Sequence, residues 1–160
     1  QIARRAGVST ALAHHYMGSK EQIFLSAMRH ILATYGAEVR NELRGVETPR
    51  ARLEGVVRAS FAESNFRPEV IGAWLMFYVS ARNLPEAARL LEVYRRRLRS
   101  NLIVGLRPLV GEGAETAADG LAAMIDGLYI RQGLGSGRAD GRAAAEIALD
   151  YLERLLEARG

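Results

Sequence analysis

Three aromatic side chains at helical spacing are the residues of this 160-residue chain best suited to holding a small molecule. Trp74, Phe77 and Tyr78 stand three and four positions apart, so they share one face of a helix. Further aromatic residues on other segments can surround that face: Phe61, Tyr94 and Tyr129. Aromatic faces attract cations, with about 0.5–2 kcal/mol from each ring, and a carboxylate nearby strengthens such a site. Asp126 or Glu63 would supply the carboxylate, and the alternative interpretation is an ordinary aromatic core.

A second group of residues suits contact with nucleic acid, and it lies near the start of the chain. Residues 1–30 carry a net charge of +3, whereas the other 130 residues carry only +1 of the total of +4. All three histidines also lie in this first segment. A local excess of positive charge is typical of a phosphate-binding surface, although chance asymmetry in a short window would look the same.

The spacing of residues in this segment predicts a helix-turn-helix. Two short helices would meet at Ala6-Gly7-Val8, and the second, from Thr10 to about Gly18, would enter the major groove of DNA. A new helix would begin at Ser19, where a capping-box pattern occurs. The predicted DNA-binding residues are Thr10, Ala11 and His14 on the base side, Tyr16 and Lys20 on phosphates, and the flanking Ser9 and His15.

The elements that must position both groups are helices. Helical spacing runs through almost the whole chain and no segment shows sustained strand alternation, so we predict an all-α fold. We expect a helix-turn-helix DNA-binding head at 1–24 and a larger helical ligand-binding and dimerisation domain at 25–160. After residue 18, capping residues and prolines predict helices over about 19–43, 49–65, 68–82, 85–106, 116–132 and 140–158.

The last two expected helices have wider apolar surfaces than packing on a single core requires. With the same pair from a second copy they would form a four-helix bundle, and this predicts a homodimer. The alternative is that both faces are buried within one chain. The residues predicted for the dimer interface are Leu121, Met124, Ile125, Leu128, Ile147, Leu149, Tyr151, Leu152 and Leu156.

The segment IARRAGVSTALAHHYMGSKEQIF resembles the DNA-binding segment of the TetR family of bacterial repressors. Ala11, Leu12 and Met17 depart from the residues common in that family. The resemblance implies a dimeric repressor of double-stranded operator DNA, with the family's first helix before Gln1. The matching positions are Ile2, Ala3, Ala6, Gly7, Val8, Ser9, His15, Tyr16, Ser19, Lys20 and Glu21.

Later segments narrow this resemblance. AWLMF from Ala73, RLLEVYRRRLRSNL from Arg89 and GLAAMIDGLYIR from Gly120 resemble the ligand domain of the choline-responsive repressors of glycine betaine synthesis. The resemblance implies release from DNA by a small-molecule inducer, choline or another cationic or apolar compound. The alternative within the same family is a regulator of an efflux or catabolic operon.

Other classes of protein fit the sequence less well. The chain has no cysteine, and its histidines lie far along the sequence from the aromatic group, so we expect no enzyme activity, no cofactor and no metal site. No apolar run is long enough to span a membrane, and we expect a cytoplasmic protein. A helical adaptor that does not bind DNA is a third alternative.

Overall fold

The structure is a computed structural model that describes residues 10–158, with side chains described from residue 20 onwards. Its described part is built from α-helices and two short 3-10 helices, which confirms the all-α prediction. The elements are α2 (Thr10–Glu42), α3 (Pro49–Ser60), η1 (Glu63–Asn65), α4 (Pro68–Ser80), α5 (Pro85–Val110), η2 (Gly111–Gly113), α6 (Ala114–Leu134) and α7 (Gly141–Glu157).

Local chemistry sets most of the helix starts where the sequence predicts them. Prolines occupy the first position of α3, α4 and α5, where the missing N–H is not needed and the fixed φ suits a helix. The Thr48 side chain accepts a hydrogen bond from the Ala51 backbone N–H at 3.2 Å, and Asp140 does the same for Ala143 at 3.0 Å. These caps satisfy N–H groups that have no partner inside their own helix.

The predicted break at Gly18–Ser19 is wrong, because α2 continues as one helix from Thr10 to Glu42. A capping pattern contributes only about 1 kcal/mol, and a glycine inside a helix costs about the same, so neither forces the chain out of a continuous helix. A smaller difference occurs in α3, which ends at Ser60 rather than near Asn65. The helix α5 continues through Pro108 to Val110.

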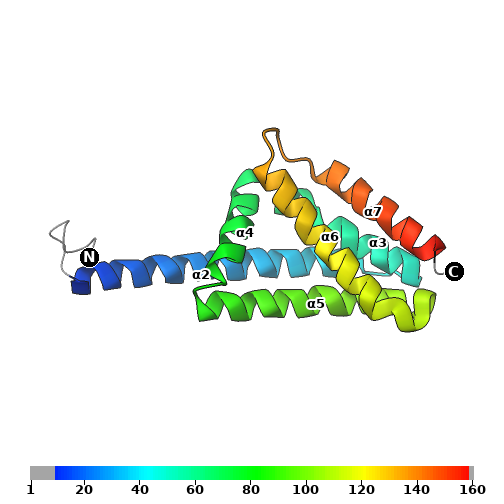
Figure 1. Ribbon diagram of the computed structural model, residues 1–160, viewed down its shortest axis with the longest axis horizontal. Helices are drawn as coiled ribbons and strands as arrows, with labels where there is room; N and C mark the ends of the chain where they lie inside the picture. The colour runs from blue at the N-terminus through cyan, green and yellow to red at the C-terminus, as the bar shows by residue number, and fades with distance from the viewer. Residues whose placement is uncertain (1–9, 159–160) are drawn as a thin grey trace.

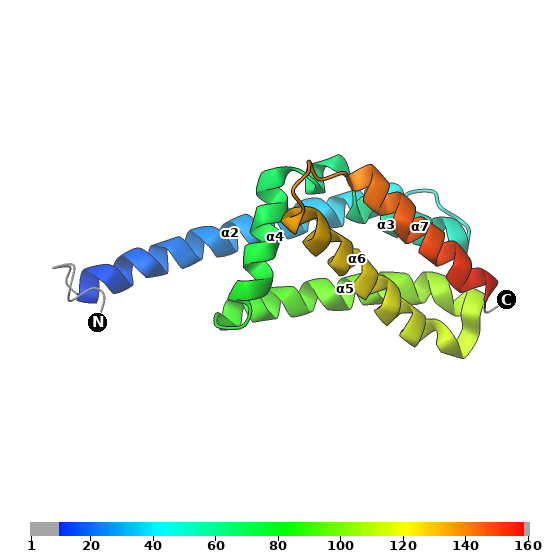
Figure 2. The same cartoon turned by 45° about the horizontal axis from the view of Figure 1, so that its top comes forward.

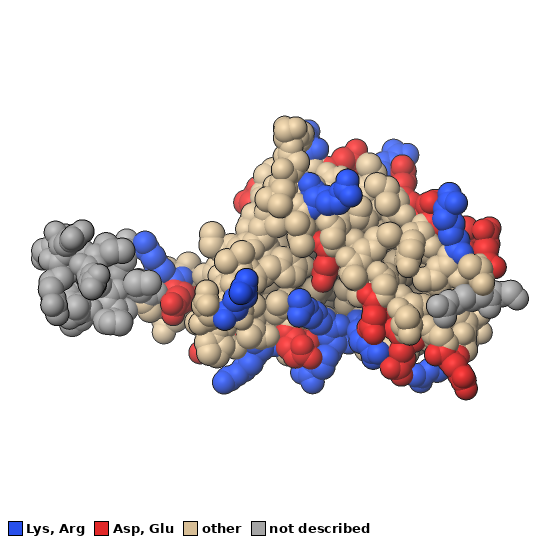
Figure 3. Space-filling view, in the orientation of Figure 1, with Lys and Arg blue, Asp and Glu red and all other residues tan. Residues whose placement is uncertain are grey.

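The helices form a packed body from which the N-terminal part of α2 projects (Figures 1 and 2). In both views α5 runs beside the C-terminal part of α2, α4 crosses them steeply, and α7 lies on the outside of α3 and α6. The core combines aliphatic and aromatic side chains, with fully buried Leu53, Leu98, Leu102 and Leu106 at the contact of α3 with α5 and fully buried Phe77 on α4. In the orientation of Figure 1, much of the surface over α4 and α6 is uncharged, whereas charged side chains crowd along α5 and α7 (Figure 3).

The core requires α3 and α5 to approach closely at one glycine. A Cβ atom added at Gly105 would lie 2.7 Å from Leu53 Cγ and 3.2 Å from the backbone oxygen of Pro49. Only a residue without a side chain therefore fits there.

The projecting part of α2 joins the body near Leu25, which is the first buried residue of the described side chains. Ile23, two positions earlier, is 67% exposed. Phe24 is half-buried, and its ring lies 6.5 Å from that of Phe77 on α4. Because α2 is one helix across this junction, a movement of its base moves its far end as well.

Candidate functional site

Four aromatic rings from three helices meet in the middle of the body. Trp74 and Tyr78 come from α4, Tyr94 from α5 and Tyr129 from α6. The Trp74 ring centroid lies 4.7 Å from that of Tyr94, 5.9 Å from that of Tyr78 and 6.1 Å from that of Tyr129. We call Trp74, Tyr78, Tyr94, Tyr129 and the carboxylate of Asp126 the aromatic cage. The structure thus brings together five of the seven residues predicted for the ligand site.

Asp126 supplies the negative charge of the aromatic cage. Its Oδ1 accepts hydrogen bonds from the hydroxyl groups of Tyr78 and Tyr94, each at 3.0 Å. Burial raises the pKa of Asp126, while the two tyrosine hydrogen bonds and the charge of Arg95 act against that rise. Burial and the same carboxylate raise the pKa of Tyr78 and of Tyr94, so both phenols stay protonated donors.

Further hydrogen bonds hold Tyr129 of the aromatic cage and the neighbouring Tyr35 in place. The Tyr129 hydroxyl lies 2.8 Å from the backbone oxygen of Ser60 and 3.3 Å from that of Asn65. The hydroxyl of Tyr35 on α2 lies 3.3 Å from Ser60 Oγ, and the Ser60 hydroxyl donates to Val56 O at 2.9 Å. Burial raises the pKa of Tyr35 to about 12. The rings are therefore held by their polar ends, and the aromatic faces are left for packing or for a ligand.

The cavity inside the aromatic cage is very small. It measures about 10 Å³ and is lined by Tyr35, Ser60, Asn65 and the four cage rings. That volume accommodates about one water molecule, so a larger guest has to move the rings apart. Trp74 is buried, and its Nε1–H has no hydrogen-bond partner among the described residues. An unpaired buried donor is uncommon and indicates a place where a ligand or water completes the site.

Two predicted ligand residues lie outside this cavity. Phe61 stacks on the outer side of Tyr129 at 5.9 Å between ring centroids. Phe77 packs behind Trp74 at 5.7 Å and reaches Phe24 on its other side. Both support cage rings from behind instead of lining the cavity.

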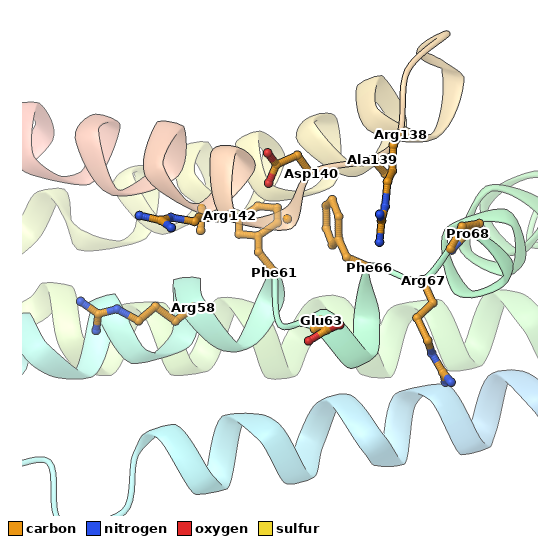
Figure 4. A pocket seen from close by; sticks show the side chains of 12 residues that line it. Arg58, Phe61, Glu63, Phe66, Arg67, Pro68, Arg138, Ala139, Asp140 and Arg142 are labelled. Atoms are coloured by element: carbon orange, nitrogen blue, oxygen red, sulfur yellow. The ribbon is translucent and has the colours of Figure 1, made fainter.

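Glu63, the alternative carboxylate, does not belong to the aromatic cage. It is exposed beside a different cavity of about 670 Å³, between η1 and the start of α7 (Figure 4). Basic and acidic side chains share the lining of that cavity, which includes Arg58, Arg67, Arg138 and Arg142 as well as Glu63 and Asp140. Asp126 is therefore the carboxylate available to a cation in the aromatic cage.

The predicted DNA-binding residues lie at the far end of α2. Ser9 falls outside the described residues. Thr10, Ala11, His14, His15 and Tyr16 lie on the first turns of α2, and their side chains are also outside what the structure describes. Lys20 is exposed on the projecting part of the helix. The roles assigned to these residues stay predictions.

The prediction of a dimer contact is wrong for three residues. Leu121, Ile125 and Leu152 are buried in the core of their own subunit, so they cannot face a partner. Leu149 and Leu156 are half-buried beside α3, where they line a small cavity with Arg50 and Glu54. The remaining ones are Met124 and Leu128 on α6 and Ile147 and Tyr151 on α7.

These four residues lie on neighbouring helices and leave one accessible apolar face. Ile147 is 51% exposed, and Met124, Leu128 and Tyr151 are half-buried. A Cβ atom added at Gly120 would lie 3.3 Å from the Tyr151 hydroxyl, so this side of α7 lies against α6. The face formed by Met124, Leu128, Ile147 and Tyr151 is named the α6–α7 face below.

Comparison with known proteins places the chain in a family. Residues 49–157 match the C-terminal domain of BetI-type transcriptional repressors. The chain is 47% identical over 161 residues to the HTH-type transcriptional regulator BetI of Rhizobium meliloti, covering 100% of this chain and 79% of that protein. It is 44% identical over 153 residues to BetI of Brucella anthropi, covering 95% and 79%. The chain belongs to the BetI-type family of transcriptional repressors.

Solved structures share the fold of this BetI-type repressor. A transcriptional regulator from a Rhodococcus species matches with a TM-score of 0.71 and 27% identity over 97% of this chain and 82% of that one. A transcriptional regulator from Saccharomonospora viridis, solved in complex with choline, matches with a TM-score of 0.69 and 22% identity over 95% and 82%. The family assignment confirms the resemblance read from the sequence.

The sequence did not reveal three residues that line the cage cavity in this BetI-type repressor. Tyr35, Ser60 and Asn65 come from three different elements, and no local spacing links them to Trp74. The one available signal was weak: Tyr35 lies on the apolar side of α2, four residues before the buried Val39. Within the described residues, no group of three acidic or histidine side chains could hold a metal ion, and no helix could cross a membrane.

Proposed function

We propose that this repressor binds operator DNA as a homodimer and releases it when a quaternary ammonium compound, choline first among the candidates, enters the aromatic cage. The observation that carries the proposal is the meeting of three tyrosine rings around Trp74, because two of these tyrosines, Tyr78 and Tyr94, also donate hydrogen bonds to the half-buried carboxylate of Asp126. The regulator from Saccharomonospora viridis, which shares the fold, was solved with choline bound.

The chemistry of the aromatic cage suits choline at both of its ends. A trimethylammonium group cannot be neutralised by losing a proton, so a buried site must offer it aromatic faces and a negative charge. The aromatic cage has both in Trp74, the three tyrosines and Asp126. The hydroxyl oxygen of choline would accept the hydrogen bond that Trp74 Nε1–H offers and that no described residue takes up.

Ligand binding would reach the DNA-binding end through the rings behind the cage. Trp74 contacts Phe77, and Phe77 contacts Phe24 at the base of the projecting part of α2. A cavity of about 10 Å³ must widen for choline, and widening it moves these packed rings. Because α2 has 33 residues and is about 50 Å long, a small tilt at its base displaces its far end by several ångströms.

The α6–α7 face would hold the two subunits together. Apolar side chains from the two helices form a continuous face there, and pairing it with its copy gives a four-helix bundle. The subunits would thereby set the separation of the two DNA-binding ends, which must match successive major grooves roughly 34–36 Å apart. Choline would bind more tightly to a conformation in which the two DNA-binding ends stand at a different separation, and it would thereby favour that conformation.

Isothermal titration calorimetry of the dimer with choline tests the proposal. The matched control ligand is 3,3-dimethyl-1-butanol, which has the shape of choline but carries no charge. We expect choline to bind at least about tenfold more tightly than the uncharged analogue, since each ring and the carboxylate act on the charge alone. Equal affinities for the two compounds, or heat from apolar compounds only, would instead support a regulator of an efflux or catabolic operon.

A further inference from the structure

A second cavity adjoins the aromatic cage, and the two share a wall. This groove of about 510 Å³ lies between α2 and α5 and is lined by both Tyr35 and Tyr94. The same two tyrosines line the cage cavity. Their ring centroids are 5.8 Å apart in an edge-to-face arrangement, so a single layer of two rings separates the groove from the aromatic cage.

The groove is basic, and no carboxylate lines it. Arg40 of α2, Arg52 of α3 and Arg97 of α5 converge on it together with Ser100 and Asn101. The guanidinium groups of these three arginines form no ion pair and no hydrogen bond with a described residue. In addition, Arg52 Nε is buried and has no hydrogen-bond partner there.

Two arginines close to them on the same helices do have acidic partners. Arg58 on α3 pairs with Glu54 at 2.8 Å, and Arg99 on α5 pairs with Asp119 at 2.7 Å. The larger cavity near η1 also contains arginines, but Glu63 and Asp140 share it. Three uncompensated guanidinium groups in one groove therefore indicate a site for an anion, because planar guanidinium groups recognise carboxylate and phosphate oxygens.

The charges are ordered from the inside to the outside. The carboxylate of Asp126 lies in the aromatic cage and attracts a cation, whereas the groove on the other side of Tyr35 and Tyr94 attracts an anion. We propose that the site also takes a small zwitterion, with its quaternary ammonium group in the aromatic cage and a carboxylate or phosphate in the groove lined by Arg40, Arg52 and Arg97, once the rings of Tyr35 and Tyr94 move apart to join the two cavities. This inference rests on the proposed function, because it extends the ligand of the same site.

Contact of the groove with operator DNA is not the reason for its charge. Arg40 follows the first described residue of α2 by 30 positions, which is about 45 Å along a helix. The predicted DNA-binding residues lie at the opposite end of that helix. An anion in the groove therefore has to come from a ligand in solution.

Three probes separate the two halves of the site: choline carries the cation alone, inorganic phosphate the anion alone, and phosphocholine both. Calorimetry on the full dimer would compare wild type with a double variant that carries both Arg40→Gln and Arg97→Gln. Both positions are exposed, so the substitutions should not disturb the core. Arg96→Gln is the matched control, because Arg96 is exposed on the same helix and pairs with Glu92 instead of lining the groove.

We expect phosphocholine to bind wild type and Arg96→Gln on the order of tenfold more tightly than choline, and added salt to reduce that difference. The double variant should bind phosphocholine no more tightly than choline, and its affinity for choline should equal that of wild type.

Two results would show that the zwitterion inference is wrong while the proposed function stands. One is that wild type binds choline but binds phosphocholine no more tightly, and the other is that the double variant still prefers phosphocholine. Phosphate that binds as well as phosphocholine, without competing with choline, would show a separate anion site and also overturn the inference. If neither choline nor phosphocholine binds, the proposed function fails as well.

Discussion

Replacing Asp126 with asparagine tests the charge of the aromatic cage with little change in shape. Asparagine keeps an oxygen that can accept the hydrogen bonds of Tyr78 and Tyr94, which lie at 3.0 Å from Asp126 Oδ1. A carboxylate and an ammonium group about 5 Å apart attract by about 3 kcal/mol at an effective dielectric constant of about 20. Desolvation reduces this to about 2 kcal/mol, so Asp126→Asn should weaken choline binding about 30-fold.

The same substitution should not destabilise the fold. Burial raises the folded-state pKa of Asp126 above its unfolded value, so the charged form is the one that folding disfavours. This group therefore opposes folding at neutral pH, and its unfavourable contribution decreases as the pH falls through the raised pKa. Removing the charge should leave the free energy of unfolding at pH 7 unchanged or higher, as urea denaturation would measure.

The pH dependence of choline binding should have the opposite sign. Choline favours the charged carboxylate, so its affinity should decrease as the pH falls through the pKa of Asp126, which lies above that of an ordinary aspartate. Calorimetry between pH 7.5 and pH 5 measures this, and Asp126→Asn should show no such slope. If the variant is as stable as wild type in urea and binds choline as wild type does, then the carboxylate is not what recognises the cation.

Four further substitutions, one of them with a matched control variant, test other parts of the molecule. Lys20→Ala should weaken operator binding about tenfold and lower its salt dependence by about one phosphate contact in a fluorescence titration, with the dimer intact. Ile147→Asp should give monomers by light scattering, whereas Met76→Asp, on the exposed face of α4, should stay dimeric. Phe77→Leu should bind choline within about threefold of wild type but fail to release DNA, since it interrupts the ring contacts toward α2. Gly105→Ala should lower the free energy of unfolding by about 1–3 kcal/mol, because its Cβ would meet Leu53 Cγ at 2.7 Å; no change would mean that α3 and α5 separate easily.

Features governed by neighbours in the sequence were predictable. The starts of α3, α4, α5 and α7 follow from prolines and from the side chains of Thr48 and Asp140, each of which acts within one helical turn. The grouping of Trp74 with Tyr78 follows in the same way from the periodicity of one helix. Tyr94, Asp126 and Tyr129 were assigned to the same site by residue type alone, as aromatic side chains and a carboxylate on other segments.

Features governed by packing between helices were not predictable. The apolar spacing of α6 and α7 shows that Leu121, Ile125 and Leu152 are covered, but it cannot tell whether the covering surface belongs to the same chain or to a second copy. Tyr35 joins the cage cavity because the middle of α2 passes beside α5, which no local pattern encodes. The continuity of α2 across Gly18 was not predictable either, because the cap and the glycine each change the free energy by only about 1 kcal/mol and do not decide whether the helix breaks.

The small volume of the aromatic cage explains how a weak ligand can control DNA binding. With a cavity of about 10 Å³, the closed arrangement satisfies its own rings through mutual contacts and leaves only Trp74 Nε1–H without a partner. Under the proposed function, choline would first have to separate rings that pack 4.7–6.1 Å apart, and this opening free energy would be subtracted from its affinity. The same opening would displace Phe77 and Phe24, so the energy that weakens binding would be the energy that drives the change at α2. A variant that held the cage open would therefore bind choline more tightly and respond to it less.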